Sequence, residues 1–266
     1  MNVTPVVKQL LIINIIFFIG TQIVPIAETY FALHYFENPL FQFWQPLTHM
    51  FMHGNLMHIF FNMFALYSFG STLENFWGWK KFLFFYISCG LGAAFIYTAV
   101  NYLQNQYIFE QLSSLNLSKT DIQILLNADY AGVFNEDGQM MAGKVKTILE
   151  SAKFNQEQFD SLGTAIRNFK STCVGASGAV YGLLIAFAFM FPNAELGIMF
   201  IPVPVKAKYF VPVYMLLFDG LFGIFGNALF GYNSGIAHVA HIGGALTGFI
   251  MMWYWKKNSF NENRWN

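Results

Sequence analysis

The sequence predicts an all-α membrane protein with six transmembrane helices and a polar extramembrane insertion between the third and fourth helices. Composition and spacing both support this fold class. The 266 residues are 56% hydrophobic and only 11% charged, whereas a soluble domain carries about 25% charged residues. The apolar residues gather into runs of about 20, the length that an α-helix needs to cross about 30 Å of hydrocarbon. Helices suit lipid because they pair their own backbone polar groups.

Six apolar runs are expected to form the transmembrane helices, and charged or helix-breaking residues bound them. They cover about residues 8–27, 55–74, 81–103, 172–191, 207–226 and 235–255. Pro192, for example, follows the fourth run and cannot continue its helix. The stretch before the second run contains Pro39, Pro46 and the turn signal Gly54-Asn55, so it is expected to be a structured loop.

The runs divide the chain into four regions. These are residues 1–103 with the first three helices, 104–170 as a polar extracytoplasmic insertion, 171–257 with the last three helices, and 258–266 as a cytoplasmic tail. The insertion holds 8 of the 14 Asp and Glu residues, so it is not expected to be a seventh span. Capping residues in 118–127 and apolar residues at helical intervals in 144–169 indicate a pair of short amphipathic helices. Two roles stay open for the insertion, a lid over a site and a flexible spacer.

The basic residues outside the insertion orient the helices. All of them fall on one side of the six-helix arrangement: Lys8, Lys80, Lys81, Lys206, Lys208, Lys256, Lys257 and Arg264. The positive-inside rule therefore predicts cytoplasmic termini and an insertion on the outer side. No small-residue cleavage site follows the first apolar run, so we expect a retained helix rather than a signal peptide. Because no presequence is visible, the expected location is a bacterial inner membrane.

Composition also argues against several ligands. The formal net charge is zero, which does not favour nucleic-acid binding. The two cysteines, Cys89 and Cys173, form neither a disulfide framework nor a metal motif, and Cys89 is expected to serve helix packing. No His-Glu-x-x-His motif accompanies His49, His53 and His58, so no metal or cofactor is expected. His49 and His53 are expected to form hydrogen bonds within the loop. The sequence does not predict an oligomeric state.

Polar side chains inside the apolar runs cost free energy and therefore require an explanation. Ser177, His58 and His241 lie on three runs that cross in the same direction, and all three lie about 5–10 Å below the outer helix ends. A serine beside an imidazole can act as a nucleophile, because the imidazole takes up its proton. Asn62 follows His58 by four residues, so both side chains can donate hydrogen bonds from one helix face.

Three short motifs carry these residues. They read Gly175-Ala176-Ser177-Gly178, then Ala240-His241 followed by Gly244 and Gly248, and His58 followed by Asn62. On these runs they resemble the Gly-x-Ser-Gly, Ala-His-x-x-Gly-x-x-x-Gly and His-x-x-x-Asn motifs of the rhomboid intramembrane serine proteases. Gly70 and Glu74 also resemble the end of the second helix in that family, where Glu74 is expected to be a structural hydrogen-bonding group. The resemblance covers the six helices but not residues 104–170.

The resemblance implies an endopeptidase that cleaves single-span membrane proteins near the outer membrane face. It implies a Ser–His dyad without a third acid, in which Ser177 is the nucleophile and His241 the base. His58 and Asn62 would line the oxyanion hole. The expected partners are therefore transmembrane substrates and the lipid bilayer.

Further residues are expected to support this site. The resemblance implies that Tyr181 packs against the ring of the base, and Gly175 and Gly178 allow a close approach to the serine. One departure concerns the loop before the second helix, where the family carries a Trp-Arg pair and this chain has Trp44-Gln45. The departure puts the anchoring of that loop in doubt, but it does not affect the catalytic roles that the resemblance implies for Ser177 and His241.

Other interpretations compete with this one. His238 is a second candidate base, but it lacks the glycines at the third and seventh following positions that His241 has. Asp219 lies in the fifth run, where it is expected to cap a polar network or to pair locally, not to act in catalysis. An inactive rhomboid-like protein that binds membrane proteins would have lost the dyad. A metal or solute transporter requires polar residues through the full membrane depth, whereas the inner halves of the fourth and sixth runs are apolar apart from Thr247.

Overall fold

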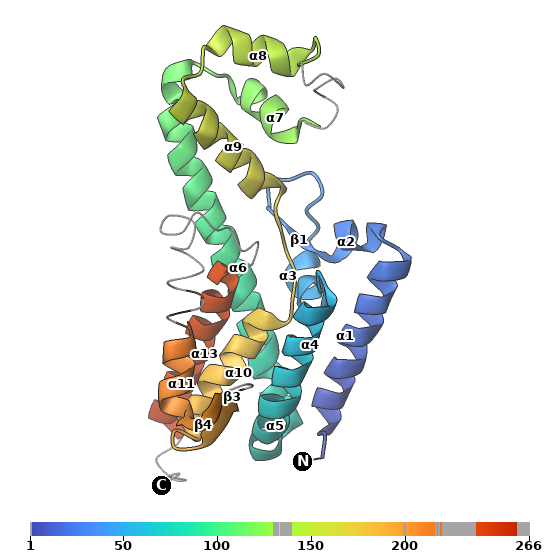
Figure 1. Ribbon diagram of the computed structural model, residues 1–266, viewed down its shortest axis with the longest axis vertical. Coiled ribbons are helices and arrows are strands. Elements are labelled where there is room, and N and C mark those ends of the chain that lie inside the picture. Colours follow the sequence, from blue (N-terminus) through green and yellow to red (C-terminus); the bar gives the residue numbers. More distant parts are fainter. Residues whose placement is uncertain are drawn as a thin grey trace. The chain divides into compact units, whose positions relative to one another are not determined.

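The computed structural model describes residues 2–129, 133, 140–198, 201–215, 217, 219 and 238–259 (Figure 1). Three parts of the expected arrangement lie outside these residues. They are the connection 227–234 between the fifth and sixth helices, most of the second half of the fifth helix, and residues 260–266 of the tail. The described chain is mostly helical. It forms two compact units: Met1–Leu33, Phe43–Tyr97 and Cys173–Asn266 make up the first, and His34–Gln42 and Thr98–Thr172 make up the second.

The first unit begins with α1 (Pro5–Ile23), which is long and apolar enough to span a membrane. Pro5 suits its first turn, where a backbone N–H has no helical acceptor. The helix ends before the predicted residue 27, because Pro25 lacks an N–H and cannot continue it. A short helix, α2 (Ile26–Phe31), follows.

A structured loop precedes the second spanning helix, as its proline and glycine residues predicted. It contains α3 (Gln45–Thr48) and the 3₁₀ turn η1 (His49–Phe51). Asn55 then caps the next helix, since its side chain accepts a hydrogen bond of 2.9 Å from the backbone N–H of His58.

The second spanning helix is one apolar helix over Leu56–Trp77. It consists of α4 (Leu56–Ala65), the π-helical turn η2 (Leu66–Gly70) and α5 (Ser71–Trp77). It ends at Gly78, whose φ of +76° favours glycine. The third spanning helix, α6 (Trp79–Leu112), is longer than the predicted 81–103. It continues past the apolar run because glutamine, glutamate and leucine are good helix formers, and it contributes residues to both units.

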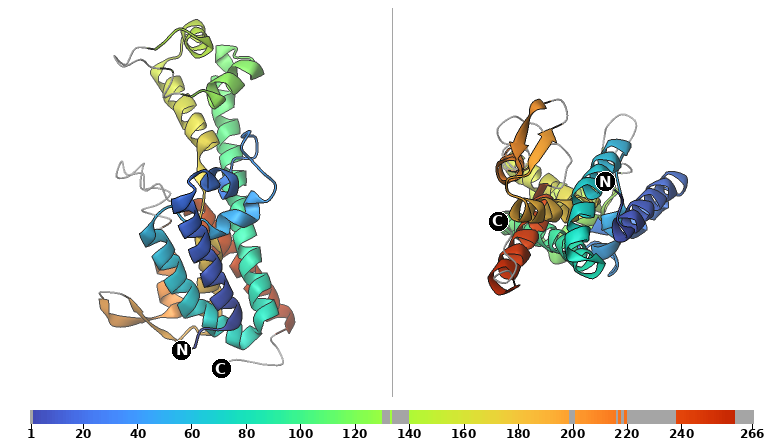
Figure 2. Two further views of the ribbon diagram at one scale, coloured as in Figure 1. Left: turned by 90° about the vertical axis from the view of Figure 1, so that its right-hand side faces the viewer. Right: turned by 90° about the horizontal axis from the view of Figure 1, so that it is seen from below.

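The described residues of the first unit also form α10 (Ser177–Met190), α11 (Ala207–Tyr214) and α13 (His238–Ser259). α10 begins later than the predicted residue 172, because Thr172–Cys173 is extended as strand β2. An antiparallel pair of strands, β3 (Glu195–Ile198) and β4 (Ile201–Lys206), lies between α10 and α11 and was not predicted. Figure 2 shows that α13 ends at the same end of this unit at which α1 begins. A further two-residue strand is β1 (Leu33–His34).

Three of the described helices are long and apolar enough to cross a membrane. These helices begin at Pro5, Leu56 and Trp79. α10 is also apolar but has only 14 residues. These helices support an integral membrane protein. The described part of the chain does not show the six spanning helices that the sequence predicted.

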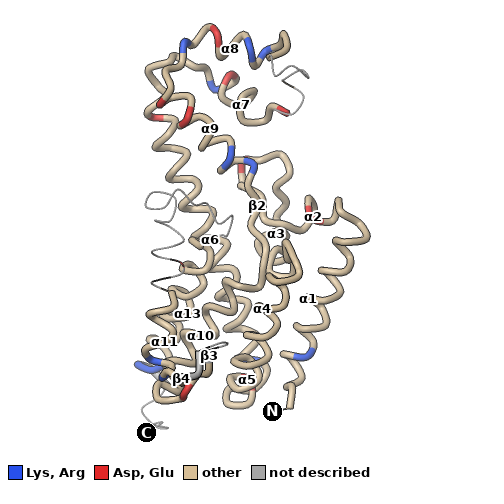
Figure 3. The backbone as a smooth tube through the Cα atoms, in the orientation of Figure 1, with Lys and Arg blue, Asp and Glu red and all other residues tan. Residues whose placement is uncertain are grey.

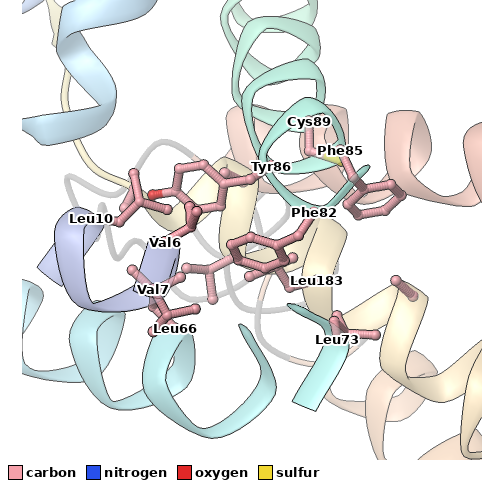
Figure 4. Close-up of a cluster of buried hydrophobic side chains, with 14 of the residues drawn as sticks. Val6, Val7, Leu10, Leu66, Leu73, Phe82, Phe85, Tyr86, Cys89 and Leu183 are labelled. Atoms are coloured by element: carbon pink, nitrogen blue, oxygen red, sulfur yellow. The ribbon is translucent and has the colours of Figure 1, made fainter. Parts of the chain in front are cut away.

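The hydrophobic core of the first unit joins residues of α1, the second spanning helix, α6, α10 and α13 (Figure 4). Its most deeply buried members include Val7 from α1, Leu66 and Leu73 from the second spanning helix, Phe82, Phe85 and Tyr86 from α6, and Leu183 from α10. Cys89 is fully buried among them, so its thiol serves packing, as expected. Lipid is as apolar as these side chains, so the close fit between them holds the helices together.

Glu74 fastens the start of α1 to this core. Its carboxylate accepts hydrogen bonds from the backbone N–H groups of Val6 and Val7, at 3.0 and 2.9 Å, and from the hydroxyl of Thr4. The first N–H groups of a helix have no helical acceptor, and the helix dipole favours a negative charge beside them. The expectation that Glu74 is a structural hydrogen-bonding group is therefore confirmed.

The second unit contains the end of α6 and the helices α7 (Lys119–Asn127), α8 (Lys144–Ala152) and α9 (Gln156–Lys170), with a 3₁₀ turn η3 (Ser113–Leu115). Ser118 and Asn155 begin α7 and α9 with capping boxes. The buried residues form a separate core of Tyr35, Ile108, Leu112, Leu125, Leu126, Ile148, Leu162, Ala165 and Phe169. The insertion is thus a folded helical unit, but its described residues form three short helices where the sequence predicted a pair, because the stretch 144–169 divides after α8 at Lys153, whose φ is +50°.

The contacts of Glu74 generate a stability prediction. Glu74→Gln should lower the free energy of unfolding by about 1–3 kcal/mol, because an amide cannot accept all the hydrogen bonds that the buried carboxylate accepts. Thermal unfolding in detergent measures the change. Glu28→Gln is the control, since Glu28 is an exposed carboxylate at the start of α2. Equal unfolding temperatures for both variants would contradict a structural role of Glu74.

Candidate active site

Ser177 is the first residue of α10. The turn that leads into the helix depends on Gly175, whose φ of +126° is open to glycine but strained for other residues. The N–H of Gly175 donates to the carbonyl oxygen of His49 at 2.9 Å and ties the turn to the η1 loop. Ser177 therefore stands where backbone N–H groups lack helical acceptors and the helix dipole is positive.

Two glycines of α13 bring this helix against α10. A Cβ atom on Gly244 would lie 1.9 Å from the carbonyl oxygen of Gly178, and one on Gly248 would lie 2.8 Å from the Cα of Gly182. Any side chain at these positions of α13 would push the helices apart. Small residues allow such close contact between helices in lipid, and the contact carries His241 toward Ser177.

Ser177 and His241 form a hydrogen-bonded pair. The Oγ of Ser177 lies 2.8 Å from the Nε2 of His241. The ring of Tyr181, one turn further along α10, stacks on the imidazole with ring centroids 4.4 Å apart and an angle of 19° between the planes. The stacking and the hydrogen bond fix the imidazole plane. The structure thus brings together three residues that the sequence had assigned to one site.

Asp219 also reaches this pair. Its Oδ1 lies 2.8 Å from the Nδ1 of His241 and 2.7 Å from the Nδ1 of His238, and its side chain is only 1% exposed. An acid thus lies beside the expected Ser177–His241 dyad, for which the resemblance implied no third acid. The expectation that Asp219 belongs to a local polar network is confirmed. No short motif indicates this contact, because the acid and the imidazole are 22 residues apart and meet only through tertiary packing.

The side chain of His58 faces the same small space as Ser177. A Cβ atom on Gly175 would lie 2.7 Å from the Nε2 of His58 and 3.3 Å from the Oγ of Ser177. Asn62, one turn along α4, is buried, and its Nδ2 has no hydrogen-bond acceptor among the described residues. A buried donor without an acceptor costs free energy, so Asn62 and His58 are suited to donate to an atom of a bound molecule.

The loop histidines differ from each other. The Nδ1 of His49 lies 3.1 Å from the carbonyl oxygen of Gln45, as expected of a loop hydrogen-bonding group. The ring nitrogens of His53 have no well-formed hydrogen bond within the described chain, and the nearest backbone acceptor is that of Phe51 in the same loop. Its ring packs edge-on against that of His58 at 5.1 Å, and burial lowers the pKa of His53 to about 3. His53 is thus a neutral ring that supports the position of His58.

The Trp44-Gln45 pair anchors the loop before the second spanning helix. The Nε1 of Trp44 donates to the carbonyl oxygen of Tyr30 at 2.9 Å. Gln45 is fully buried, and its Nε2 lies 3.4 Å from the carbonyl oxygens of Thr29 and Tyr30. A neutral amide thus anchors the loop at the position where the rhomboid proteases that the sequence resembles carry an arginine.

Donor atoms of Asp219, His238 and His241 lie within 4.8 Å of one another, a spacing that would also suit a metal ion. The sequence gave no motif for this group. The same atoms already form hydrogen bonds between the carboxylate and both imidazoles, so the protein alone accounts for their convergence.

Comparison with known proteins identifies the family. The rhomboid domain family matches residues 40–113 and 123–258, which extends into the insertion. An uncharacterized mitochondrial rhomboid protein of Schizosaccharomyces pombe is 28% identical over 228 residues, which are 82% of this chain and 53% of that protein. The chain thus spans about half the length of this relative. Because the relative is described as mitochondrial, the comparison does not support the bacterial inner membrane that the sequence led us to expect. The rhomboid domain match covers most of the chain, and the chain therefore belongs to the rhomboid family.

Proposed function

We propose that the chain is an intramembrane serine endopeptidase in which Ser177 attacks the peptide bond of a transmembrane substrate. The single observation that carries the proposal is the 2.8 Å separation between the Oγ of Ser177 and the Nε2 of His241. Serine is a weak nucleophile until a neighbouring base takes its proton, and this distance is within the range for that transfer. The presence of both residues argues against an inactive protein that only binds its partners.

The proposed reaction has two acyl-transfer steps. His241 takes the proton of Ser177 while the Oγ attacks the carbonyl carbon, and it then gives this proton to the leaving amine. The resulting ester on Ser177 is hydrolysed by a water molecule, with His241 again as the base. The developing oxyanion accepts hydrogen bonds from the backbone N–H at the start of α10 and from the side chains of His58 and Asn62.

The proposed position of cleavage follows from the direction of the helices. In the first unit, Lys and Arg residues lie mostly toward the end where α1 begins, which the positive-inside rule assigns to the inner side (Figure 3). α10 runs toward that end from Ser177 (Figure 1). We therefore place the site in the outer half of the membrane, where single-span substrates are cleaved near their outer ends.

The first test concerns the serine and its base. Ser177→Ala and His241→Ala should each abolish cleavage of a single-span reporter by purified protein in lipid vesicles, because neither group acts without the other. His238→Ala should keep much of the activity, and EDTA should change nothing. Inactivation by EDTA, or a strict requirement for His238, would show that the reaction uses the Asp219 group as a metal site or a different base.

The second test concerns the oxyanion donors. His58→Ala and Asn62→Ala should each reduce kcat by about 10²–10³, the usual cost of removing one such donor. Phe61→Ala is the matched control on the same helix, because its ring is half exposed. Unfolding temperatures show whether each variant keeps its fold. If both variants cleave at the wild-type rate, the second spanning helix takes no part in the reaction.

The third test concerns orientation. In a background with Cys89→Ala and Cys173→Ala, Glu150→Cys on α8 should react with an impermeant maleimide added to intact cells of a bacterial expression host. Lys8→Cys should react only after lysis. Both positions are exposed, so differences in labelling report the side of the membrane. The reverse pattern would place the site near the inner face.

A further inference from the structure

The Ser177–His241 chemistry proposed above makes no use of Asp219, although this acid is among the most deeply buried charged side chains of the described chain. A carboxylate in an apolar helix bundle is costly and is retained where it has a task. We propose that Asp219 is a positioning residue: its Oδ1 holds the hydrogen of His241 on Nδ1, so that Nε2 faces Ser177 as a free acceptor. This inference rests on the proposed peptidase function and deepens it.

The chemistry of imidazole explains why such a group is needed. A neutral imidazole carries one hydrogen, on either Nδ1 or Nε2, and only the nitrogen without hydrogen accepts a proton. An ionised carboxylate has acceptors and no donor. The 2.8 Å contact between Asp219 Oδ1 and His241 Nδ1 therefore requires the hydrogen on Nδ1. The Nε2 at 2.8 Å from Ser177 Oγ is then the atom that receives the serine proton.

The carboxylate also matches the charge that develops during the reaction. When His241 takes the serine proton, it becomes an imidazolium in a buried site, where an unpaired charge is costly. Asp219 lies in direct hydrogen-bond contact with this ring and is buried more deeply than the ring itself. The negative charge is thus already in place before the positive charge forms, which lowers the cost of the proton transfer.

His238 shares the carboxylate oxygen with His241. Its Nδ1 lies 2.7 Å from the same Oδ1, and the two imidazole planes are 82° apart. One carboxylate oxygen accepts two hydrogen bonds through its two lone pairs, so the two histidines do not exclude each other. His238 orients the carboxylate from the preceding turn of α13. Its loss leaves the contact between Asp219 and His241 in place.

Asp219→Asn tests the positioning role. An amide presents a donor as well as an acceptor, so it no longer selects the hydrogen on Nδ1. We expect kcat for a single-span reporter to fall by about 10⁴, the cost of the same change in a soluble serine-protease triad, while KM stays within about twofold because Asp219 touches no substrate. Asp219→Glu keeps the carboxylate and should recover part of the activity.

Glu74→Gln is the matched control. It also converts a buried carboxylate of the first unit to an amide, but its hydrogen bonds go to the start of α1. It should lower thermal stability and leave kcat near the wild-type value. A loss of activity through general disruption of the fold would affect both variants alike.

A spectroscopic measurement reads the tautomer directly. In protein labelled with ¹⁵N-histidine, the shifts of the His241 ring, assigned by their loss in His241→Ala, distinguish hydrogen on Nδ1 from hydrogen on Nε2. We expect Nδ1–H in the wild type and a shift toward Nε2–H in Asp219→Asn. His238→Ala should retain the wild-type tautomer of His241.

The outcomes separate this inference from the proposed function. If Ser177→Ala is inactive but Asp219→Asn cleaves like the wild type, the positioning role is wrong and the peptidase stands. An unchanged His241 tautomer in Asp219→Asn also overturns the positioning role. If the wild type cleaves no reporter, the proposed function fails, and the tautomer measurement still decides whether Asp219 sets the hydrogen on His241.

Discussion

The candidate site depends on one steric constraint, the absence of side chains where α13 meets α10. Gly244 lies so close to the carbonyl oxygen of Gly178 that no other residue fits there. Helices usually pack with their axes 8–10 Å apart, a distance at which a serine on one and an imidazole on the other must span a layer of side chains. The glycines remove that layer of side chains. The two helices therefore approach closely enough for Ser177 and His241 to form a direct hydrogen bond. The stacking of Tyr181 on the imidazole then fills the remaining space.

Much of this arrangement could be predicted from the sequence, because it depends on local patterns. Apolar runs of the required length indicated the spanning helices that begin at Pro5, Leu56 and Trp79. The spacing of glycines after His241 distinguished it from His238, and the structure places His241 and not His238 beside Ser177. Capping residues indicated the helices of the insertion. In each case the signal and the structural feature lie within a few residues of each other.

The remainder depends on contacts between distant residues, which leave no local pattern. Asp219 could be recognised as a costly acid inside an apolar run, but its partner could not, because only tertiary packing brings its carboxylate to His241, 22 residues away. The extended backbone at Thr172–Cys173 was hidden in an apolar run that reads equally well as helix. The β3–β4 pair was missed because its alternation is short and proline-rich, which resembles a loop.

The length of α10 has a consequence for the surrounding lipid. A helix of 14 residues rises about 21 Å, which is less than the roughly 30 Å of an average hydrocarbon layer. A short apolar helix favours a locally thinner bilayer, at a cost that grows with each ångström of mismatch. For the proposed peptidase, a substrate helix that entered this thin zone would expose more of its length to water and headgroups, where its backbone could exchange helical hydrogen bonds for those of solvent. Under the proposed function, membrane thickness would act as a selectivity factor beside the side chains, and the same protein would favour different substrate helices in bilayers of different lipid composition.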